Sequence, residues 1–242
     1  MKYGLISDIH GNLEALEAVL KELEHETVDE ILCLGDLIGY GPDPEACVNL
    51  VREHASVILA GNHDYASLGL LDISYFNPHA RRAIEWTSSQ ISEKTRKFLT
   101  ERPLKVEFDL FTIVHATPLN PSAWDYILSL EDAVENFPHF QGQCCFIGHS
   151  HVPVVIVQDQ SQKVSVKQVT ELTFVENERY IINIGSVGQP RDFDPRATFA
   201  TFDTEAKHYR LFRVHYDIQK TQKKILERGL PPFLAERLST GQ

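Results

Sequence analysis

The chain has 242 residues, of which 43% are apolar and 24% charged, an ordinary globular composition with enough apolar material for a core. Its formal net charge of −11 argues against a surface that coats nucleic acid, because contacts with phosphates need Lys and Arg. No apolar stretch approaches the roughly 20 residues that span a bilayer, so we expect no membrane partner.

The cysteines and the N-terminus indicate a cytoplasmic protein. The four cysteines form neither a disulfide framework nor a Cys-x-x-Cys pair. Cys144 and Cys145 are adjacent on an expected strand, so they should point to opposite faces and pack in a reducing compartment. The N-terminus begins like a strand and lacks the basic and apolar regions of a signal peptide.

The first quarter of the chain repeats a strand, a loop and a helix. The expected strands cover 2–7, 29–34 and 56–59, and Asn12 and Pro44 begin helices. Polar motifs follow each strand. This rhythm predicts a sheet whose strand C-terminal ends carry the chemistry, as is usual for open α/β sheets.

Residues 65–100 depart from this rhythm and predict a helical excursion that could cover the mouth of a site. Asn77-Pro78 is a good N-cap and N1 pair, and apolar residues then recur at helical spacing. We expect an interruption of this helix at Ser88-Ser89.

From residue 104 the pattern predicts mostly strands. A helix begins at Ser129 with Asp132 as capping-box partner, and a last helix runs from Asp217 to Gly229. Without a Ser/Gly-rich linker, we expect one domain over 1–242. The expected strands are 104–108, 111–115, 144–147, 153–157, 163–169, 179–184, 197–203 and 208–214.

Five short motifs, each next to an expected strand, contain residues of the types that bind metals. In Asp-x-His and His-x-His, an extended backbone would direct both side chains to the same face. The carboxylate of Asp36 can bridge two ions, and Asn62 offers a weaker carbonyl oxygen. The seven candidate ligands are Asp8, His10, Asp36, Asn62, His115, His149 and His151.

Seven oxygen and nitrogen ligands are too many for one zinc ion but suit two divalent metals with a bridging carboxylate. A lone histidine is more often a surface or core residue than a ligand. Here, however, five of the eleven histidines lie in motifs at strand ends. The set predicts a two-metal site that hydrolyses a phosphate ester.

The order of the motifs, D-x-H, G-D-x-x-G, G-N-H-D, H and G-H-x-H, resembles the calcineurin-like metallophosphoesterase family over residues 4–153. Residues 183–192 also resemble a segment common in its small bacterial and archaeal phosphodiesterases. The resemblance implies an α/β (α+β) fold, a four-layer sandwich of two mixed β-sheets flanked by helices.

The resemblance also implies roles for the candidate residues. His63 would lie at the substrate phosphate, either as the acid toward the leaving oxygen or as a stabiliser of charge. Asp36 would belong to both metal sites. One metal would be held by Asp8, His10, Asp36 and His151, and the other by Asp36, Asn62, His115 and His149.

One motif departs from the phosphoprotein phosphatase branch, whose second motif reads G-D-x-x-D-R-G. Gly39 and Tyr40 replace the Asp that supports the catalytic histidine and the Arg that grips phosphate. Protein phosphatase activity is therefore not expected. Asp64, next to His63, is a candidate substitute for the missing carboxylate.

We therefore expect a phosphodiesterase that acts on a small molecule or nucleotide through a hydroxide bridging two metals about 3.5–4 Å apart. Alternatives are a phosphomonoesterase, a dinucleoside polyphosphate hydrolase or, less favoured, a binding scaffold like the retromer subunit that resembles this family. Mixed N/O ligands accept Mn, Fe, Zn, Co, Ni or Mg, with Mn or Fe favoured.

Two residues are candidates for substrate binding. Arg191 could clamp phosphate with its planar guanidinium, the alternative being a surface arginine paired with Asp192 or Asp194. Tyr40 could line the pocket or only pack in its turn. Trp124 could stack on a base or sugar, although packing in the core or rim is favoured.

Overall fold

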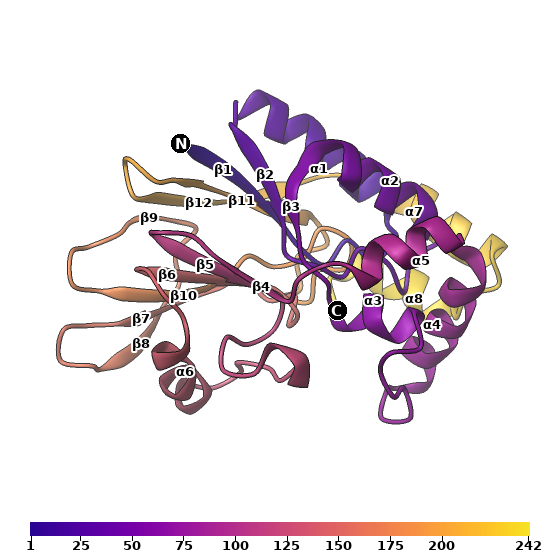
Figure 1. Ribbon diagram of the computed structural model, residues 1–242. Coiled ribbons are helices and arrows are strands. Elements are labelled where there is room, and N and C mark those ends of the chain that lie inside the picture. Colours follow the sequence, from indigo (N-terminus) through magenta and orange to yellow (C-terminus); the bar gives the residue numbers. More distant parts are fainter.

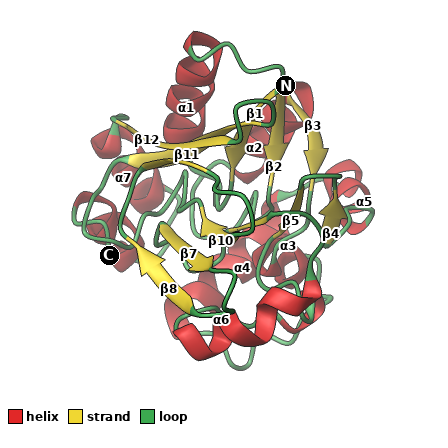
Figure 2. Ribbon diagram, turned by 90° about the vertical axis from the view of Figure 1, so that its left-hand side faces the viewer, coloured by secondary structure: helices red, strands yellow, loops and turns green.

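The computed structural model describes residues 1–242 as two mixed β-sheets that face each other, with helices on the outside (Figure 1, Figure 2). This confirms the predicted fold class. Helices α1 (Leu13–His25) and α2 (Pro44–His54) cover one sheet, and α6 (Leu130–Asn136) covers the other. None of the helices combines the length and the apolar character that a membrane span requires.

The first sheet has six strands, and three of them run parallel. Strand β1 pairs in parallel with β2, and β2 with β3, while β11, β12 and β9 continue the sheet in antiparallel fashion. In spatial order the strands are β3 (Ala55–Ile58), β2 (Glu30–Cys33), β1 (Lys2–Ile6), β11 (Ala197–Asp203), β12 (His208–Val214) and β9 (Glu171–Thr173).

The second sheet has the same kind of organisation. Strands β5, β6 and β10 are parallel neighbours, and β4, β7 and β8 pair antiparallel at its two sides. In spatial order the strands are β4 (Lys105–Glu107), β5 (Phe111–Val114), β6 (Cys144–Ile147), β10 (Arg179–Asn183), β7 (Val154–Gln158) and β8 (Val164–Lys167).

Side chains at the expected helix starts cap the helices. The side chain of Asn12 accepts a hydrogen bond from the Ala15 amide, and Ser129 forms the expected capping box with Asp132. The remaining helices are α3 (Asn62–Ser67), α4 (Pro78–Gln90), α5 (Glu93–Thr100), α7 (Ile218–Glu227) and α8 (Pro232–Glu236).

One large core lies between the two sheets, and another of similar size lies beneath α1 and α2. Phe146 of the second sheet contacts Phe202 of the first sheet at a ring-centroid distance of 5.2 Å. Cys144 belongs to this core, whereas its neighbour Cys145 packs on the opposite face beneath α6, as the alternation of a strand requires. A separate apolar cluster joins α4, α7 and α8.

Several local predictions need correction. Ser88 and Ser89 lie inside α4, and the helix breaks instead at Ile91–Ser92, where the Ser92 side chain caps α5 by accepting from the Thr95 amide. Three short elements, α3, α8 and β9, were not expected. They are only three to six residues long, so they carry no full period of apolar residues.

Replacement of Phe146 should strongly destabilise the fold. Its side chain is 0% exposed between the sheets, so Phe146→Ala should lower the free energy of unfolding by about 3–5 kcal/mol through lost burial and a residual cavity. Urea denaturation measures this loss. Phe193→Ala is the matched control because Phe193 is 77% exposed, and equal losses for the two variants would contradict the assigned core.

Candidate metal centre

The seven candidate ligands meet where strand ends of the two sheets come together. Asp8 and His10 follow β1, Asp36 follows β2, and Asn62 follows β3 in the first sheet. The second sheet contributes its histidines from the loops after β5 and β6. All seven side chains are buried, so the two sheets bring together groups that are distant in sequence.

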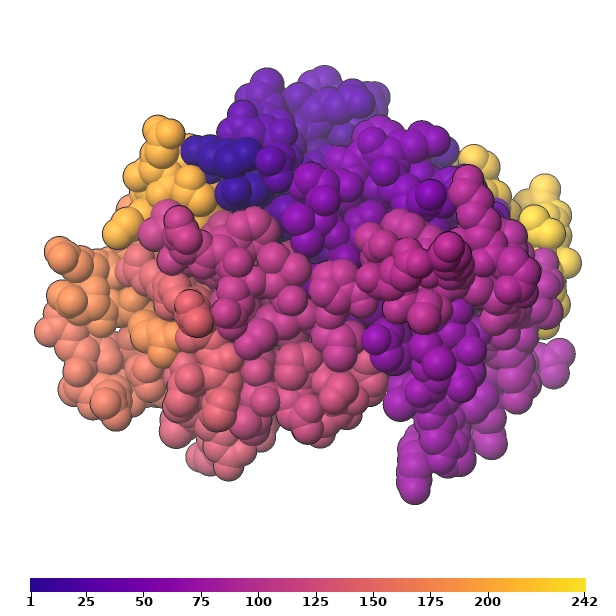
Figure 3. Space-filling model, viewed as in Figure 1, coloured from indigo at the N-terminus to yellow at the C-terminus, as the bar shows by residue number.

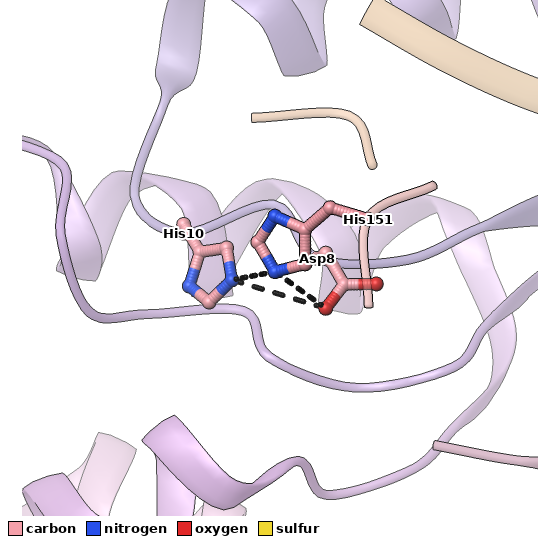
Figure 4. Close-up of side chains that lie close together, drawn as sticks. All are labelled: Asp8, His10 and His151. Carbon is pink, nitrogen blue, oxygen red and sulfur yellow. Dashed lines mark hydrogen bonds and ion pairs between the residues drawn. The ribbon is translucent and has the colours of Figure 1, made fainter. Parts of the chain in front are cut away.

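Asp8, His10 and His151 form one group of converging side chains (Figure 4). The Nε2 atom of His151 lies 3.3 Å from Asp8 Oδ1 and 3.1 Å from His10 Nε2. Two imidazole nitrogens and a carboxylate oxygen at this spacing are a suitable ligand set for a divalent transition metal.

Asp36, His115 and His149 form a second group, with ligand atoms within 4.8 Å of one another. His115 Nε2 lies 3.4 Å from Asp36 Oδ2 and 3.3 Å from the side-chain oxygen of Asn62. The same Asp36 oxygen is 3.5 Å from His10 Nε2, which belongs to the first group. Asp36 therefore lies between the two groups.

Backbone carbonyls orient the imidazole rings. His10 Nδ1 is 3.1 Å from the Ile38 carbonyl, and His115 Nδ1 is 2.9 Å from the Leu34 carbonyl. A carbonyl only accepts, so each Nδ1 must carry a proton, and in the neutral ring the Nε2 lone pair faces the site. This is how outer hydrogen bonds usually fix the tautomer of a metal-binding histidine.

The two histidines of the Gly-His-Ser-His motif use opposite nitrogens. His151 donates from Nδ1 to the Gln189 carbonyl at 2.6 Å, so its Nε2 lone pair is free. His149 donates from Nε2 to the Trp124 carbonyl at 2.9 Å, which leaves Nδ1 as its free lone pair. Gln189 and Trp124 act through their carbonyls, and no side-chain pattern in a sequence could reveal this role.

The Oδ2 atom of Asp36 is buried without a hydrogen-bond partner, whereas Oδ1 accepts from the His63 amide at 2.8 Å. A buried carboxylate oxygen without a donor is costly unless a cation neutralises it. Because imidazole lone pairs converge on this oxygen, the donor set fits divalent metal ions.

The backbone around these ligands is not extended, contrary to the expectation for Asp-x-His and His-x-His. Asp8, His10, Asp36, His149 and His151 all have left-handed φ values between 51° and 68°. Such conformations cost on the order of 1 kcal/mol each for residues with a Cβ. The side chains converge because each loop turns sharply after its strand.

Burial and charge shift the histidine pKa values in different directions. Burial lowers the pKa of His63 to about 4 and that of His149 to about 3. Burial also opposes the charged form of His115, but the carboxylate of Asp36 outweighs this effect and raises its pKa to about 9 while no ion is bound; a metal at Nε2 would displace this proton.

His63 points into the site, and its Nδ1 is buried without a hydrogen-bond partner. Its ring lies 4.8 Å from that of His10 and 4.3 Å from that of Tyr40. Asp64 does not support His63, because its carboxylate accepts hydrogen bonds from the amides of Asp36 and nearby loop residues. Asp64 thus holds the loop that carries Asp36.

A cavity of about 380 Å³ opens beside the candidate ligands. Figure 3 shows the surface hollowed between the segments around residues 70–80 and 120–126. The segment before α4 thus borders the mouth, in agreement with the position expected for the helical excursion. The lining includes His63, His149, Tyr40, Tyr75, Phe76, Trp124 and Tyr126.

Arg191 and Tyr40 lie next to each other in the structure. Arg191 pairs with neither nearby aspartate, because Asp192 binds Arg213 and Asp194 binds Arg196. Its guanidinium instead lies 3.4 Å from the Tyr40 hydroxyl. Tyr40 is buried, packs on His10 and His63, and also lines the cavity.

Comparisons with known proteins agree with this geometry. A family model described as "Calcineurin-like phosphoesterase superfamily domain" matches residues 1–207. An uncharacterised protein of Methanocaldococcus jannaschii is 38% identical, with 98% of this chain and 97% of that protein covered.

Two solved structures are similar over the whole chain. A metallophosphoesterase from Sphaerobacter thermophilus is 43% identical with a TM-score of 0.88, and the match covers 100% of this chain and 99% of that one. A hypothetical protein from Pyrococcus horikoshii shares the fold at 17% identity, with a TM-score of 0.79 and coverage of 100% and 98%. The chain therefore belongs to the calcineurin-like metallophosphoesterases, which are hydrolases of phosphoric esters.

Proposed function

We propose that the protein is a phosphodiesterase that uses two divalent metal ions to hydrolyse a small-molecule or nucleotide phosphodiester. The observation that carries this proposal is the buried, unpartnered Oδ2 of Asp36 between His10 and His115. An oxygen in this position suits a carboxylate that bridges two cations.

In this proposal Asp8, His10 and His151 bind one metal, Asn62, His115 and His149 bind the other, and Asp36 binds both. Bound metals would supply the positive charge that activates a water molecule and neutralises the phosphate oxygens. We favour Mn or Fe. The carbonyls behind the imidazoles keep the ligand atoms in place before any ion arrives.

His63 would contact the substrate phosphate from the side of Tyr40. Because burial lowers the pKa of His63 to about 4, its ring is neutral at neutral pH. A neutral imidazole still donates one N–H. We therefore assign it a hydrogen bond to the leaving oxygen that strengthens as negative charge develops there.

The cavity supports a diester rather than a monoester substrate. Its volume of about 380 Å³ falls in the range of small-molecule sites. Aromatic side chains contribute to its lining, among them Tyr75, Phe76, Trp124 and Tyr126. An organic group on a non-leaving oxygen would have apolar surface to contact there.

Loss of a candidate ligand should remove both metal and activity. Asp36→Asn and His149→Ala should reduce hydrolysis of bis-p-nitrophenyl phosphate by at least about a hundredfold, because metals carry the charge stabilisation. Elemental analysis should show less bound metal in both variants. His139→Ala, at an exposed histidine, is the control, and wild-type rates in the ligand variants would refute the proposed site.

Replacement of His63 should slow the reaction without removing metal. We expect His63→Gln to lower kcat by about 10²-fold or more for a poor alkoxide leaving group, but less for p-nitrophenolate, which needs no hydrogen bond to depart. Rates for diesters with graded leaving groups measure the difference. An equal loss for all leaving groups would instead favour a role in stabilising phosphate charge.

A substrate panel separates the diester proposal from its rivals. With added Mn²⁺, the protein should hydrolyse bis-p-nitrophenyl phosphate faster than p-nitrophenyl phosphate. The reverse order would favour a phosphomonoesterase. Selective turnover of dinucleoside polyphosphates would favour the corresponding hydrolase, and metal binding without any turnover would favour a binding scaffold.

A further inference from the structure

Two arginines converge on one neutral oxygen beside the candidate metal centre. The guanidinium of Arg191 donates to Gln189 Oε1 from Nη2 at 2.9 Å, and Arg237 donates to the same oxygen from Nη1 at 2.8 Å. Arg237 lies 46 positions later in the chain, in the turn after α8. Both guanidiniums are half-buried.

Neither arginine of this pair contacts an acidic side chain, and Arg237 also donates from Nε to the main-chain oxygen of Gln242. Arg196 pairs with Asp194, and Arg213 pairs with Asp192, whereas Arg191, like the half-buried Arg179, has no acidic side chain as partner. Burial, together with the charge of Arg191, lowers the pKa of Arg237 to about 10. Two like charges that share an amide oxygen leave an excess of positive charge.

The arginine pair is connected directly to the metal-binding imidazoles. The Gln189 backbone carbonyl orients His151, while its side-chain oxygen receives both guanidiniums. The Arg191 amide also donates to the His151 carbonyl at 3.2 Å, and the Tyr40 hydroxyl separates Arg191 from His63.

Each guanidinium keeps donors available for a ligand. Arg191 uses Nε and Nη2 but not Nη1, and Arg237 uses Nε and Nη1 but not Nη2. The Phe233 ring lies beneath Arg237, 5.3 Å from its Cζ, and limits where that side chain can move. Planar, restrained guanidiniums with free N–H groups are well suited to phosphate oxygens.

We propose that Arg191 and Arg237 form a subsite for a second phosphate of the substrate, separate from the phosphate that is hydrolysed. The inference rests on the proposed phosphoesterase function and deepens it, because the substrate class becomes phosphoesters with a further phosphate group. The subsite would discriminate against esters with a single phosphate.

Binding of hydrolysis-resistant probes to the Mn²⁺-loaded protein tests this proposal without requiring turnover. Titration calorimetry would compare methylenediphosphonate, which has two anionic groups, with methylphosphonate, which has one. We expect the wild-type protein to prefer the diphosphonate, and Arg237→Gln to reduce this preference about tenfold or more by removing a charge-assisted contact. Arg228→Gln, at an exposed arginine that contacts no site residue, should keep the preference.

Gln189→Glu provides a second variant in case Arg237→Gln fails to fold. A carboxylate between the two guanidiniums would occupy them internally while the backbone carbonyl still orients His151. The Gln189→Glu variant should therefore have a higher midpoint of thermal unfolding and should lose the preference for the diphosphonate. The second subsite is refuted if both Arg237→Gln and Gln189→Glu keep the wild-type preference. It is also refuted if either variant lowers the affinity for the two probes by the same factor. Absence of hydrolysis by a wild-type protein that still shows the preference would refute the proposed function alone.

Discussion

The whole architecture depends on burying two carboxylates where the sheets meet. Asp8 and Asp36 come from the first sheet, and the nearest imidazole of each comes from the second sheet, His151 at 3.3 Å and His115 at 3.4 Å. A buried charge costs several kcal/mol unless an opposite charge or donor offsets it. The carboxylates of one sheet and the imidazoles of the other can bind a shared cation only while the sheets keep this relative position, so the fold positions the site.

Gly61 and Gly148, which directly precede two candidate metal ligands, are glycines because the neighbouring atoms leave no room for a Cβ. A Cβ on Gly61 would overlap Asp36 Oδ1, and a Cβ on Gly148 would overlap the side chains of Ser7 and Asp8. The ligand residues themselves carry the strain of left-handed backbone. Such strain persists only because many hydrogen bonds determine the loops, including those that Asp64 accepts from three successive amides.

The sequence predicted the strands, the major helices and the convergence of the seven candidate ligands, because apolar periodicity and strand-end motifs are local signals. It could not predict which way a side chain turns in a loop. Asp64 therefore looked like a partner for His63 but binds amides instead. Arg237 gave no signal at all, since only the packing of α8 against α4 and α7 brings it to Gln189.

The charge distribution explains why short-range contacts must select the substrate. A protein with net charge −11 repels an anionic ester at long range, although salt screens this repulsion beyond about 8 Å. Binding therefore requires strong positive charge within the cavity itself. Arg191 lies near this cavity: its backbone amide donates to the His151 carbonyl, and its guanidinium lies 3.4 Å from the hydroxyl of Tyr40, which lines the cavity. Under the proposed function, the loop that positions the metal ligand His151 would also position the arginine that attracts a substrate anion.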